Sequence, residues 1–270
     1  LWFKTYRYIQ LDIETGAAPL VVEDLYGIYT GYPFEVRGSF ESDDPALEKI
    51  WETGWRTARL CAHETYFDCP YYEQLQYAGD TRIQALISLY VSGDDRLVRK
   101  AIRMYDLSRS YEGITCSRYP SHIPQYIPPF SLYWIGMIHD YWMHRSDDAF
   151  VRSFLPGIRT VLSWFTEKID PHTGLLKNGL PHWSFTDWAT SWERGIAPES
   201  DSSGSAITTL QLAAALDDAA DLMRRYDRPA EAKEYAATSA GLKKNVYEKC
   251  WDASKGLLRD YIGSPTYSQH

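Results

Sequence analysis

The sequence lacks the features that mark several large classes of protein. No run of apolar residues approaches the ~18–20 that cross a bilayer, so we expect no membrane-spanning helix. Basic residues are the minority, with 28 lysines and arginines against 36 aspartates and glutamates, and the net charge is −8. Because phosphate binding needs a basic face, this balance argues against a nucleic-acid partner. No HExxH, GxGxxG, Walker or GxSxG segment is present, so the chemistries tied to those motifs are not expected.

Cysteine is also scarce, and its spacing excludes a simple metal site. The 4 cysteines are scattered through the 270 residues with no CxxC pair, and we expect buried thiols rather than disulfides or metal ligands. His63 and Glu64 have no second histidine four residues after His63, so they are interpreted as structural. We therefore predict neither a metal nor a cofactor. The cysteines are Cys61, Cys69, Cys116 and Cys250.

Aromatic residues, by contrast, are abundant and many lie in segments without helical periodicity. The chain has 10 Trp, 21 Tyr and 9 Phe, together 15% of the sequence. Aromatic faces exposed in a groove can stack on the C–H faces of sugar rings. The alternative is that these large rings fill a large core.

The hydrophobic pattern changes along the chain. Residues 1–36 alternate in the manner of strands, and since isolated strands are marginal, we expect them to belong to a sheet that continues elsewhere. From about residue 43 the period is helical, with Asp44 as N-cap and Pro45 at the first helical position. The prolines between 114 and 130, including Pro128 and Pro129, are expected to exclude helix. The predicted helices are 43–61, 80–93, 95–113, 131–145, 147–169, 205–226 and 229–250.

Two similar segments indicate a repeated architecture. DPHTGLLKN at 170–178 follows one predicted helix, and DASKGLLRD at 252–260 follows another. Recurring hairpins with a recurring turn favour either an α-solenoid or a closed α/α toroid. Long loops would gather at one end of a toroid, so we expect 66–80, 114–130 and 178–200 to meet on one rim.

The densest polar segment is YFDCPYYEQLQYAGD, residues 66–80. It places Asp68, Glu73 and Asp80 among tyrosines. A carboxyl group among aromatic rings is desolvated, which raises its pKa and suits it to general-acid chemistry near neutral pH. The alternative is structural: Asp80 caps a helix, Asp68 makes a turn and Glu73 is a solvated surface group.

This segment resembles the signature of bacterial α-L-rhamnosidases, in which an Asp-Cys-Pro turn precedes a catalytic Glu and a Gly-Asp pair. RYIQL and GSFESDDPALEKIWETGWRTARLC upstream, and SRYPS, IPPFSLYWIG, FTDW and SQH downstream, fall in similar order, so the resemblance covers essentially the whole chain. It implies an all-α toroid of six helical hairpins, incomplete here. Residues 1–36 would be the last strands of a preceding β-sandwich, and 37–270 the N-terminal part of the catalytic α/α barrel.

The resemblance also implies roles for individual residues. Glu73 matches the general acid and is therefore the carboxyl group that we expect to be desolvated. Asp68 and Asp80 match the acidic residues that hold the rhamnose hydroxyls. Tyr77 falls where many members have a Trp that lines the sugar pocket. One departure is Tyr72, because many members have an arginine just before the catalytic glutamate. The remaining matches are pocket-wall residues, Trp183, Asp187 and Trp188, with Trp134 and Tyr119 as further matches.

The implied reaction is removal of terminal α-L-rhamnose with inversion. Such a reaction needs a second carboxylate ~6.5–9.5 Å from the acid to activate water. The family uses a late glutamate for this, and no residue here has a matching motif; Glu193, Glu199 and Asp201 read as a polar loop. We therefore expect the 270-residue chain alone to be nearly inactive. The alternatives are a non-catalytic carbohydrate-binding toroid, a helical scaffold for a protein partner, and a same-fold glycosidase or lyase acting on another sugar.

Overall fold

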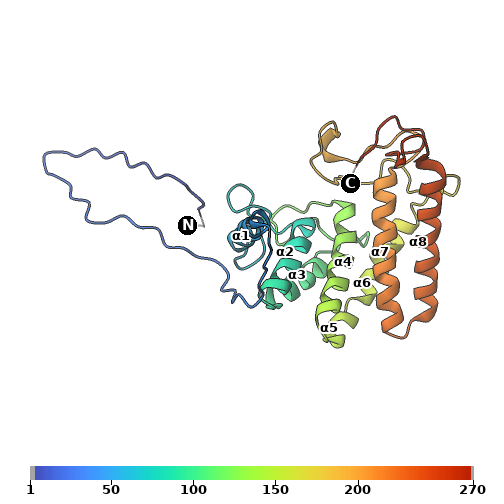
Figure 1. Cartoon of the computed structure of the whole chain (residues 1–270), viewed down its shortest axis with the longest axis horizontal. Helices are drawn as coiled ribbons and strands as arrows, with labels where there is room; N and C mark the ends of the chain where they lie inside the picture. The colour runs from blue at the N-terminus through green and yellow to red at the C-terminus, as the bar shows by residue number, and fades with distance from the viewer. Residues whose placement is uncertain (1–3, 269–270) are drawn as a thin grey trace.

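The computed structural model describes residues 4–268, and the regular secondary structure in this part of the chain is almost entirely helical (Figure 1). The helices stand side by side in sequence order, from α1 next to the N-terminal arm to α7 and α8 at the far side. The elements are α1 (Pro45–Leu60), α2 (Ala78–Val91), α3 (Arg96–Leu107), α4 (Pro128–His144), α5 (Asp148–Arg152), α6 (Leu155–Thr166), the 3₁₀ helix η1 (Glu193–Gly195), α7 (Ala206–Arg225), α8 (Pro229–Cys250), β1 (Trp251–Asp252) and β2 (Leu257–Leu258).

Helix α4 is the centre of the packing. It lies between α2 and α7 and also contacts α3, α5 and α6, while α7 and α8 form a hairpin. The sequence explains this position, because α4 is apolar nearly all round and buries most of its residues from Pro128 to Tyr141. One large buried cluster extends from Ala62 before α2 to Leu242 in α8. The predicted all-α repeat of helical hairpins is therefore confirmed.

Prolines account for two differences from the predicted helices. The segment 147–169 forms α5 and α6 rather than one helix. Pro156 has no N–H to donate to the carbonyl of Arg152, four residues earlier, and its ring would clash with that carbonyl. The helix therefore breaks between the two residues. Pro128 and Pro129, predicted to lie in a loop, instead begin α4, since the first turn of a helix needs no donor at these positions.

The two similar segments adopt the same turn. Gly174 and Gly256 both have left-handed φ values, 67° and 66°, which favour glycine. The first turn closes an Ile169–Leu176 bridge and the second joins β1 to β2. The C-terminal part of α8 holds the first turn, because the Asn245 side chain donates to the Gly174 carbonyl at 3.3 Å.

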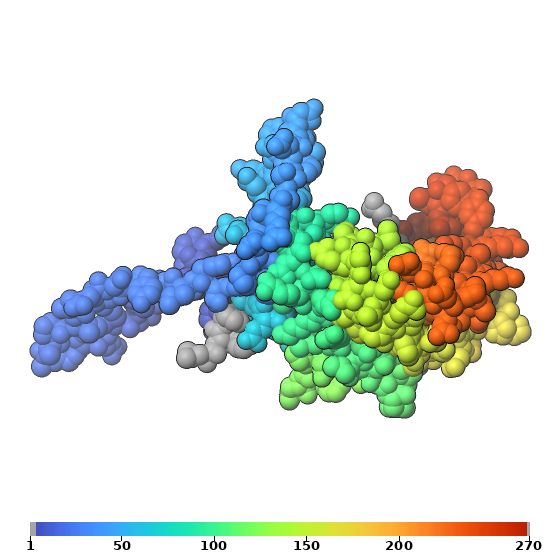
Figure 2. All heavy atoms as spheres, turned by 90° about the horizontal axis from the view of Figure 1, so that it is seen from below, coloured from blue at the N-terminus to red at the C-terminus, as the bar shows by residue number. Residues whose placement is uncertain are grey.

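The N-terminal segment differs from its prediction. Within residues 4–36 no strand is formed, and the chain runs as a long exposed arm away from the helices (Figures 1 and 2). A strand requires hydrogen bonds from a neighbour, and among the described residues the arm meets the helical body only near its ends. Thr5 donates to the Pro70 carbonyl at 2.8 Å, and the Tyr32 amide donates to the Ala62 carbonyl at 2.8 Å. The expected domain boundary near residue 36 stays a prediction.

The cysteines are free thiols. Cys61, Cys116 and Cys250 are buried and Cys69 is half-buried, in agreement with the predicted role of the thiols in packing. The ring of His63 stacks on Phe67 with centroids 4.8 Å apart, which is consistent with its interpretation as a structural residue.

Candidate active site

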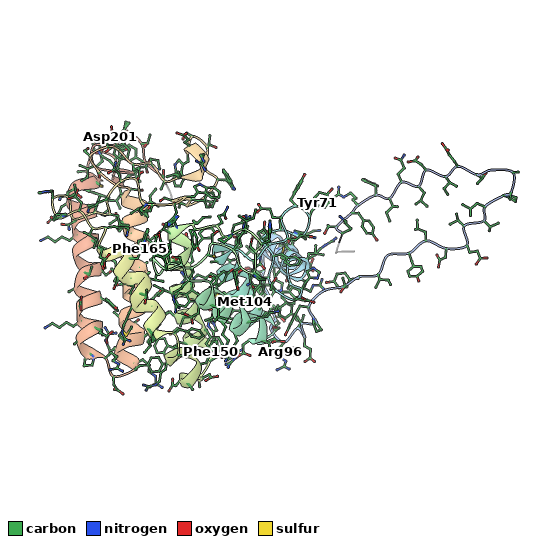
Figure 3. All side chains as sticks on the ribbon, turned by 180° about the vertical axis from the view of Figure 1, so that it is seen from behind. Tyr71, Arg96, Met104, Phe150, Phe165 and Asp201 are labelled. Atoms are coloured by element: carbon green, nitrogen blue, oxygen red, sulfur yellow. The ribbon has the colours of Figure 1, made fainter. Side chains whose placement is uncertain are left out.

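A pocket of about 560 Å³ lies where the long loops meet at one end of the helices. Figure 3 shows this end through Tyr71 and Asp201, which lie toward the loop side, whereas Arg96 and Phe150 lie toward the other. The three segments expected to share a rim all contribute to this region, so the prediction is confirmed. The pocket is lined by Asp68, Glu73, Tyr77, Gly79, Asp80, Arg82, Ile83, Leu86, Ile127, Phe130, Tyr133, Trp183, Phe185, Thr186, Asp187 and Trp188.

Backbone hydrogen bonds join the loops. Tyr77 pairs with Arg118 in an antiparallel bridge, and the Ala78 amide donates to the Ser117 carbonyl at 2.9 Å. The Trp183 amide donates to the Tyr126 carbonyl at 3.4 Å and connects the third segment to the second. The pocket walls are therefore held together by main-chain contacts.

The Asp-Cys-Pro turn presents Glu73 at its tip. The Asp68 carboxylate accepts from the Leu75 amide at 2.9 Å, and the Asp68 amide donates to the Leu75 carbonyl at 2.8 Å. Between them the chain turns through Pro70 to Gln74, whose φ of 54° is unusual for a residue other than glycine. Asp68 thus closes the loop and lines the pocket at once, so its structural and functional interpretations are compatible.

Glu73 is less buried than the aromatic surroundings in the sequence implied. Its side chain is 50% exposed. One oxygen, Oε2, accepts from the Tyr77 hydroxyl at 2.6 Å and lies 3.7 Å from Nη1 of Arg118. The prediction that Glu73 is desolvated is therefore wrong for this structure, because the turn places it at the rim.

The desolvated carboxyl group is that of Asp80. Burial, together with the negative charges of Asp68, Glu73 and Asp187, raises its pKa to about 6. Asp80 occupies the third position of α2, and its hydrogen bond to its own backbone opposes the rise. The sequence pattern thus predicted a desolvated carboxyl group in this segment, but that group belongs to Asp80 and not to Glu73.

Aromatic rings of residues 183–188 form another wall of the pocket. The ring centroids of Trp183 and Phe185 are 5.0 Å apart, and those of Phe185 and Trp188 are 5.1 Å apart. The Trp183 indole donates to the Arg194 carbonyl at 3.0 Å, which fixes its orientation. Trp188 remains 73% exposed, so its face is available to a ligand. Phe130 links the two walls, with ring centroids 6.3 Å from Tyr77 and 5.9 Å from Phe185.

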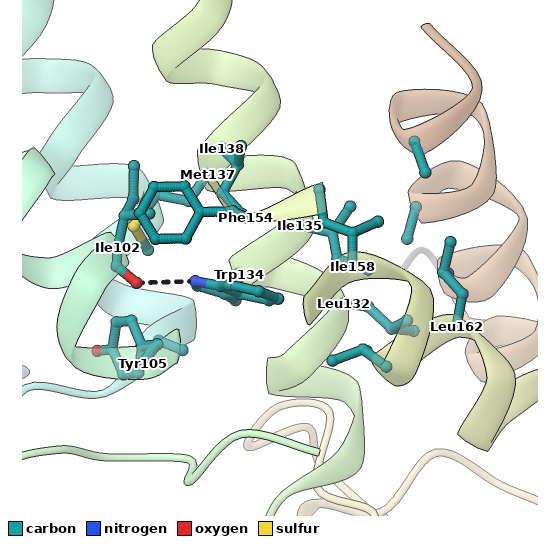
Figure 4. Close-up of a cluster of buried hydrophobic side chains, with 14 of the residues drawn as sticks. Ile102, Tyr105, Leu132, Trp134, Ile135, Met137, Ile138, Phe154, Ile158 and Leu162 are labelled. Atoms are coloured by element: carbon teal, nitrogen blue, oxygen red, sulfur yellow. Dashed lines mark hydrogen bonds between the residues drawn. The ribbon is translucent and has the colours of Figure 1, made fainter. Parts of the chain in front are cut away.

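Trp134 requires a correction, because it does not reach the pocket. Its side chain is fully buried in the core, where its indole donates to the Ile102 carbonyl at 3.0 Å and packs against Phe154 (Figure 4). On a helix that is apolar on all sides, the sequence pattern does not distinguish a core tryptophan from a pocket tryptophan. Tyr119 also lies outside the lining; its amide donates to the Gln76 carbonyl at 3.1 Å.

Several lining residues were missed from the sequence. Arg82 follows Asp80 by two residues on α2, and its guanidinium donates to both oxygens of Asp140 at 2.7 and 3.3 Å. It also lies 3.9 Å from Asp218 on α7. Phe130 and Phe185 were visible within the segments IPPFSLYWIG and HWSFTDW, although the sequence does not show which aromatic of each segment points inward.

The acidic residues of the 193–201 loop lie outside the pocket. Glu199 accepts from the Gly179 amide at 3.0 Å and so closes its own loop. Glu193 begins η1, and Asp201 lies in an exposed turn. The expectation that this is a polar loop is consistent with these positions.

Two further kinds of feature, a membrane-spanning helix and a metal site, were sought among the described residues. None of the described helices has the length and apolar character needed to span a membrane. Between residues 4 and 268, no group of three or more His, Cys, Asp or Glu side chains is arranged to hold a metal ion.

Stacked helical hairpins with a pocket of carboxylates and aromatic rings at their loop end are the arrangement expected of a six-hairpin glycosidase. Residues 35–268 match the family described as the bacterial α-L-rhamnosidase 6 hairpin glycosidase domain. The chain therefore belongs to this family. A comparison with curated proteins finds no match.

Solved structures agree with this assignment. The chain is similar to a GH78 family rhamnosidase of Bacillus sp. GL1, with 29% identity and a TM-score of 0.78, over 88% of this chain and 24% of that one. It shares its fold with a rhamnosidase from Klebsiella oxytoca with rhamnose bound, at 23% identity, a TM-score of 0.70, and coverage of 81% and 41%. An α-L-rhamnosidase of Streptomyces avermitilis complexed with L-rhamnose matches at 18% identity and a TM-score of 0.66, covering 84% and 20%. The chain thus spans less than half of each of these structures.

Proposed function

We propose that this chain forms part of a glycoside hydrolase that removes terminal α-L-rhamnose from glycosides or polysaccharides with inversion. The observation that carries the proposal is the pocket itself. Its lining combines Asp68, Glu73 and Asp80 with an aromatic wall that includes Trp183 and Trp188. A 6-deoxy sugar has both hydroxyl groups for carboxylates and an apolar face for aromatic rings. The two similar structures that contain rhamnose support this choice of sugar.

In the proposed mechanism Glu73 donates a proton to the glycosidic oxygen. Its position at the rim suits this role, because the leaving group of a terminal sugar points out of the pocket toward solvent. Asp68 and Asp80, deeper in the site, would accept hydrogen bonds from the sugar hydroxyls. Because the pKa of Asp80 is near 6, its carboxyl group would accept hydrogen bonds when ionised above that pH and could donate one when protonated below it. Trp183 and Trp188 would stack on the apolar face of the ring.

The attacking water needs a general base on the opposite face of the sugar. We propose that a carboxylate outside these 270 residues supplies it, so the chain alone would turn over rhamnosides only slightly. The chain spans 24% of the Bacillus sp. GL1 structure, which leaves room for such a residue in a larger barrel.

The test uses leaving groups of different strength in the longest natural polypeptide that contains this chain. Glu73→Gln should reduce kcat on phenyl α-L-rhamnoside ~10²–10⁴-fold, because phenolate leaves poorly without a proton. On 2,4-dinitrophenyl α-L-rhamnoside the loss should be small, since that leaving group needs no protonation. Glu193→Gln, on the outer loop, is the matched control and should leave both rates unchanged. Equal losses on both substrates for Glu73→Gln would exclude a general-acid role.

A non-catalytic carbohydrate-binding domain is the alternative from another class. It predicts binding of L-rhamnose with no turnover of either aryl rhamnoside, even in the full-length polypeptide. Another sugar is the second alternative, because Tyr72 stands where many members of the family have arginine. A panel of nitrophenyl glycosides would separate the two, as an enzyme for another sugar would hydrolyse that glycoside and leave the rhamnoside intact.

A further inference from the structure

Three side chains form a connected chain of hydrogen bonds at the pocket rim. Nη1 of Arg118 donates to the Tyr77 hydroxyl at 2.8 Å, and that hydroxyl donates to Oε2 of Glu73 at 2.6 Å. The guanidinium carbon of Arg118 also lies over the Tyr77 ring, 5.5 Å from its centroid. A tyrosine hydroxyl has one proton. Since the Tyr77 oxygen accepts a hydrogen bond from Arg118, its own proton is donated to Glu73.

The fold holds the two donors firmly. Tyr77 and Arg118 face each other in a backbone bridge, flanked by the bonds from Ala78 to Ser117 and from Tyr119 to Gln76. The Arg118 side chain is only 19% exposed. Burial, and then the hydrogen bond to Glu73, raises the pKa of Tyr77 above its ordinary value, so the hydroxyl stays a neutral donor. The donors are therefore fixed, whereas Glu73 stands half-exposed on a turn.

We propose that Tyr77 and Arg118 are positioning residues that hold the carboxyl group of Glu73 in one orientation for proton donation. This inference rests on the proposed function of Glu73. The bond from Tyr77 anchors Oε2, so Oε1 is the oxygen that carries the proton toward the glycosidic oxygen. The positive charge of Arg118, 3.7 Å from Oε2, stabilises the carboxylate that remains once the proton has left.

The role differs from that of a simple pocket wall. Tyr77 falls at a position where the resemblance places a tryptophan that lines the sugar. A wall residue would act on binding of the sugar and would affect every rhamnoside alike. A residue that orients the acid acts only where protonation of the leaving group limits the rate.

The experiment therefore measures Tyr77→Phe and Arg118→Met on phenyl and 2,4-dinitrophenyl α-L-rhamnoside, in the full-length polypeptide. Each variant should lower kcat on the phenyl substrate roughly ten- to hundredfold, the effect of a hydrogen bond to a charged group, and change the dinitrophenyl rate little. Arg118→Lys should recover part of the loss because it keeps the charge. Tyr71→Phe, in the same turn but outside the pocket lining, and Arg159→Met, in an ion pair with Glu231, are the matched controls.

A double-mutant cycle separates this inference from the proposed function. In a Glu73→Gln background, Tyr77→Phe should cause no further loss on the phenyl substrate, since the acid it positions is absent. Additive losses, or equal losses on both substrates, would overturn the positioning role while leaving Glu73 as the acid. If Glu73→Gln itself shows no dependence on the leaving group, the proposed function fails first. Circular dichroism and thermal unfolding of each variant show whether the fold is retained, and the 2,4-dinitrophenyl rate provides a second check of an intact pocket.

Discussion

Trp134 and Trp188 show how differently the two ends of this molecule use the same residue type. Trp134, in the middle of α4, is fully buried, and its indole is bonded to the Ile102 carbonyl. Trp188, in the long loop before η1, is 73% exposed beside the pocket. Helical packing thus uses its aromatic residues for stability, whereas the rim exposes them. Exposure of large rings has a free-energy cost in water, which a bound ligand would recover.

The same contrast applies to charge. In the helical body, outside the pocket lining, Arg99 is paired with Asp147, so its charge is compensated. In the pocket, by contrast, Asp68, Glu73, Asp80 and Asp187 lie together, and burial together with these negative charges raises the pKa of Asp80. Like charges held together lower stability, so this arrangement is expected where binding or catalysis requires it.

The sharpest test of this contrast removes the buried tryptophan. Trp134→Ala should lower the free energy of unfolding by about 3–5 kcal/mol, since it leaves a large cavity in the core and removes the indole hydrogen bond to the Ile102 carbonyl. Urea unfolding followed by circular dichroism measures the change. A loss below about 1 kcal/mol would mean that the core closes around the vacancy and that α4 is not the centre of the packing.

The sequence predicted the helical hairpins and the shared rim because both depend on patterns that the chain carries locally. Helical periodicity, the cap at Asp44 and the paired turns at Gly174 and Gly256 are of this kind. The degree of burial of a side chain is not local. Glu73 and Asp80 lie in the same short segment, but a turn carries one outward and the start of α2 carries the other inward.

The remaining differences have the same origin. The alternating pattern in residues 4–36 shows that this segment could form a strand. It does not show whether another strand lies beside it among the described residues. Trp134 and Trp183 stand in similarly aromatic surroundings, and only the packing of α4 against α3 and α6 separates a core residue from a pocket residue. By contrast, the break before α6 could have been predicted, since Pro156 lies inside the expected helix.

A methyl group at Gly136 should have the next largest effect. A Cβ there would lie 2.2–2.7 Å from three atoms of the Arg82 guanidinium, which packs directly on the α4 backbone. Gly136→Ala must shift the end of the Arg82 side chain and so disturb its ion pair with Asp140, and we expect a loss of up to about 3 kcal/mol, the range for overpacking.

Gly241→Ala in α8 is the matched control, because nothing lies within 4 Å of the added carbon. It should stabilise the protein by up to about 1 kcal/mol, the helix propensity of alanine over glycine. Differential scanning calorimetry of both variants gives the comparison. Equal effects of the two substitutions would show that Arg82 yields without cost.

The cluster of carboxylates should appear as a dependence of stability on pH. The folded-state pKa of Asp80 is raised to about 6 from an ordinary value of 3.8, so the folded state binds more protons than the unfolded state between these values. The contribution of Asp80 to stability is therefore full below about pH 4 and is lost as the pH rises through 6. Asp80→Asn should remove this pH-dependent loss of stability, which is on the order of 3 kcal/mol between pH 4 and pH 7 in the parent.

The measurement is the difference in unfolding free energy between parent and Asp80→Asn across pH 4 to 8. Asp227→Asn, between α7 and α8 and outside the pocket lining, serves as a control that should track the parent. A difference that does not change between pH 4 and 7 would show that burial and the neighbouring carboxylates do not raise the pKa of Asp80 in solution.

The smallest expected effect on stability belongs to the exposed tryptophan. Trp188→Ala should change the free energy of unfolding by less than about 0.5 kcal/mol, because the side chain is mostly in water already. Its effect should appear in binding instead, where loss of one stacking face should weaken L-rhamnose binding several-fold, as followed by isothermal titration calorimetry. Trp188→Phe should keep part of the affinity, since a smaller ring still offers a face. A large loss of stability in Trp188→Ala would instead show that the ring braces the loop against Trp183 and Phe185. The two tryptophans would then both be structural, and the contrast between the core and the rim would not hold.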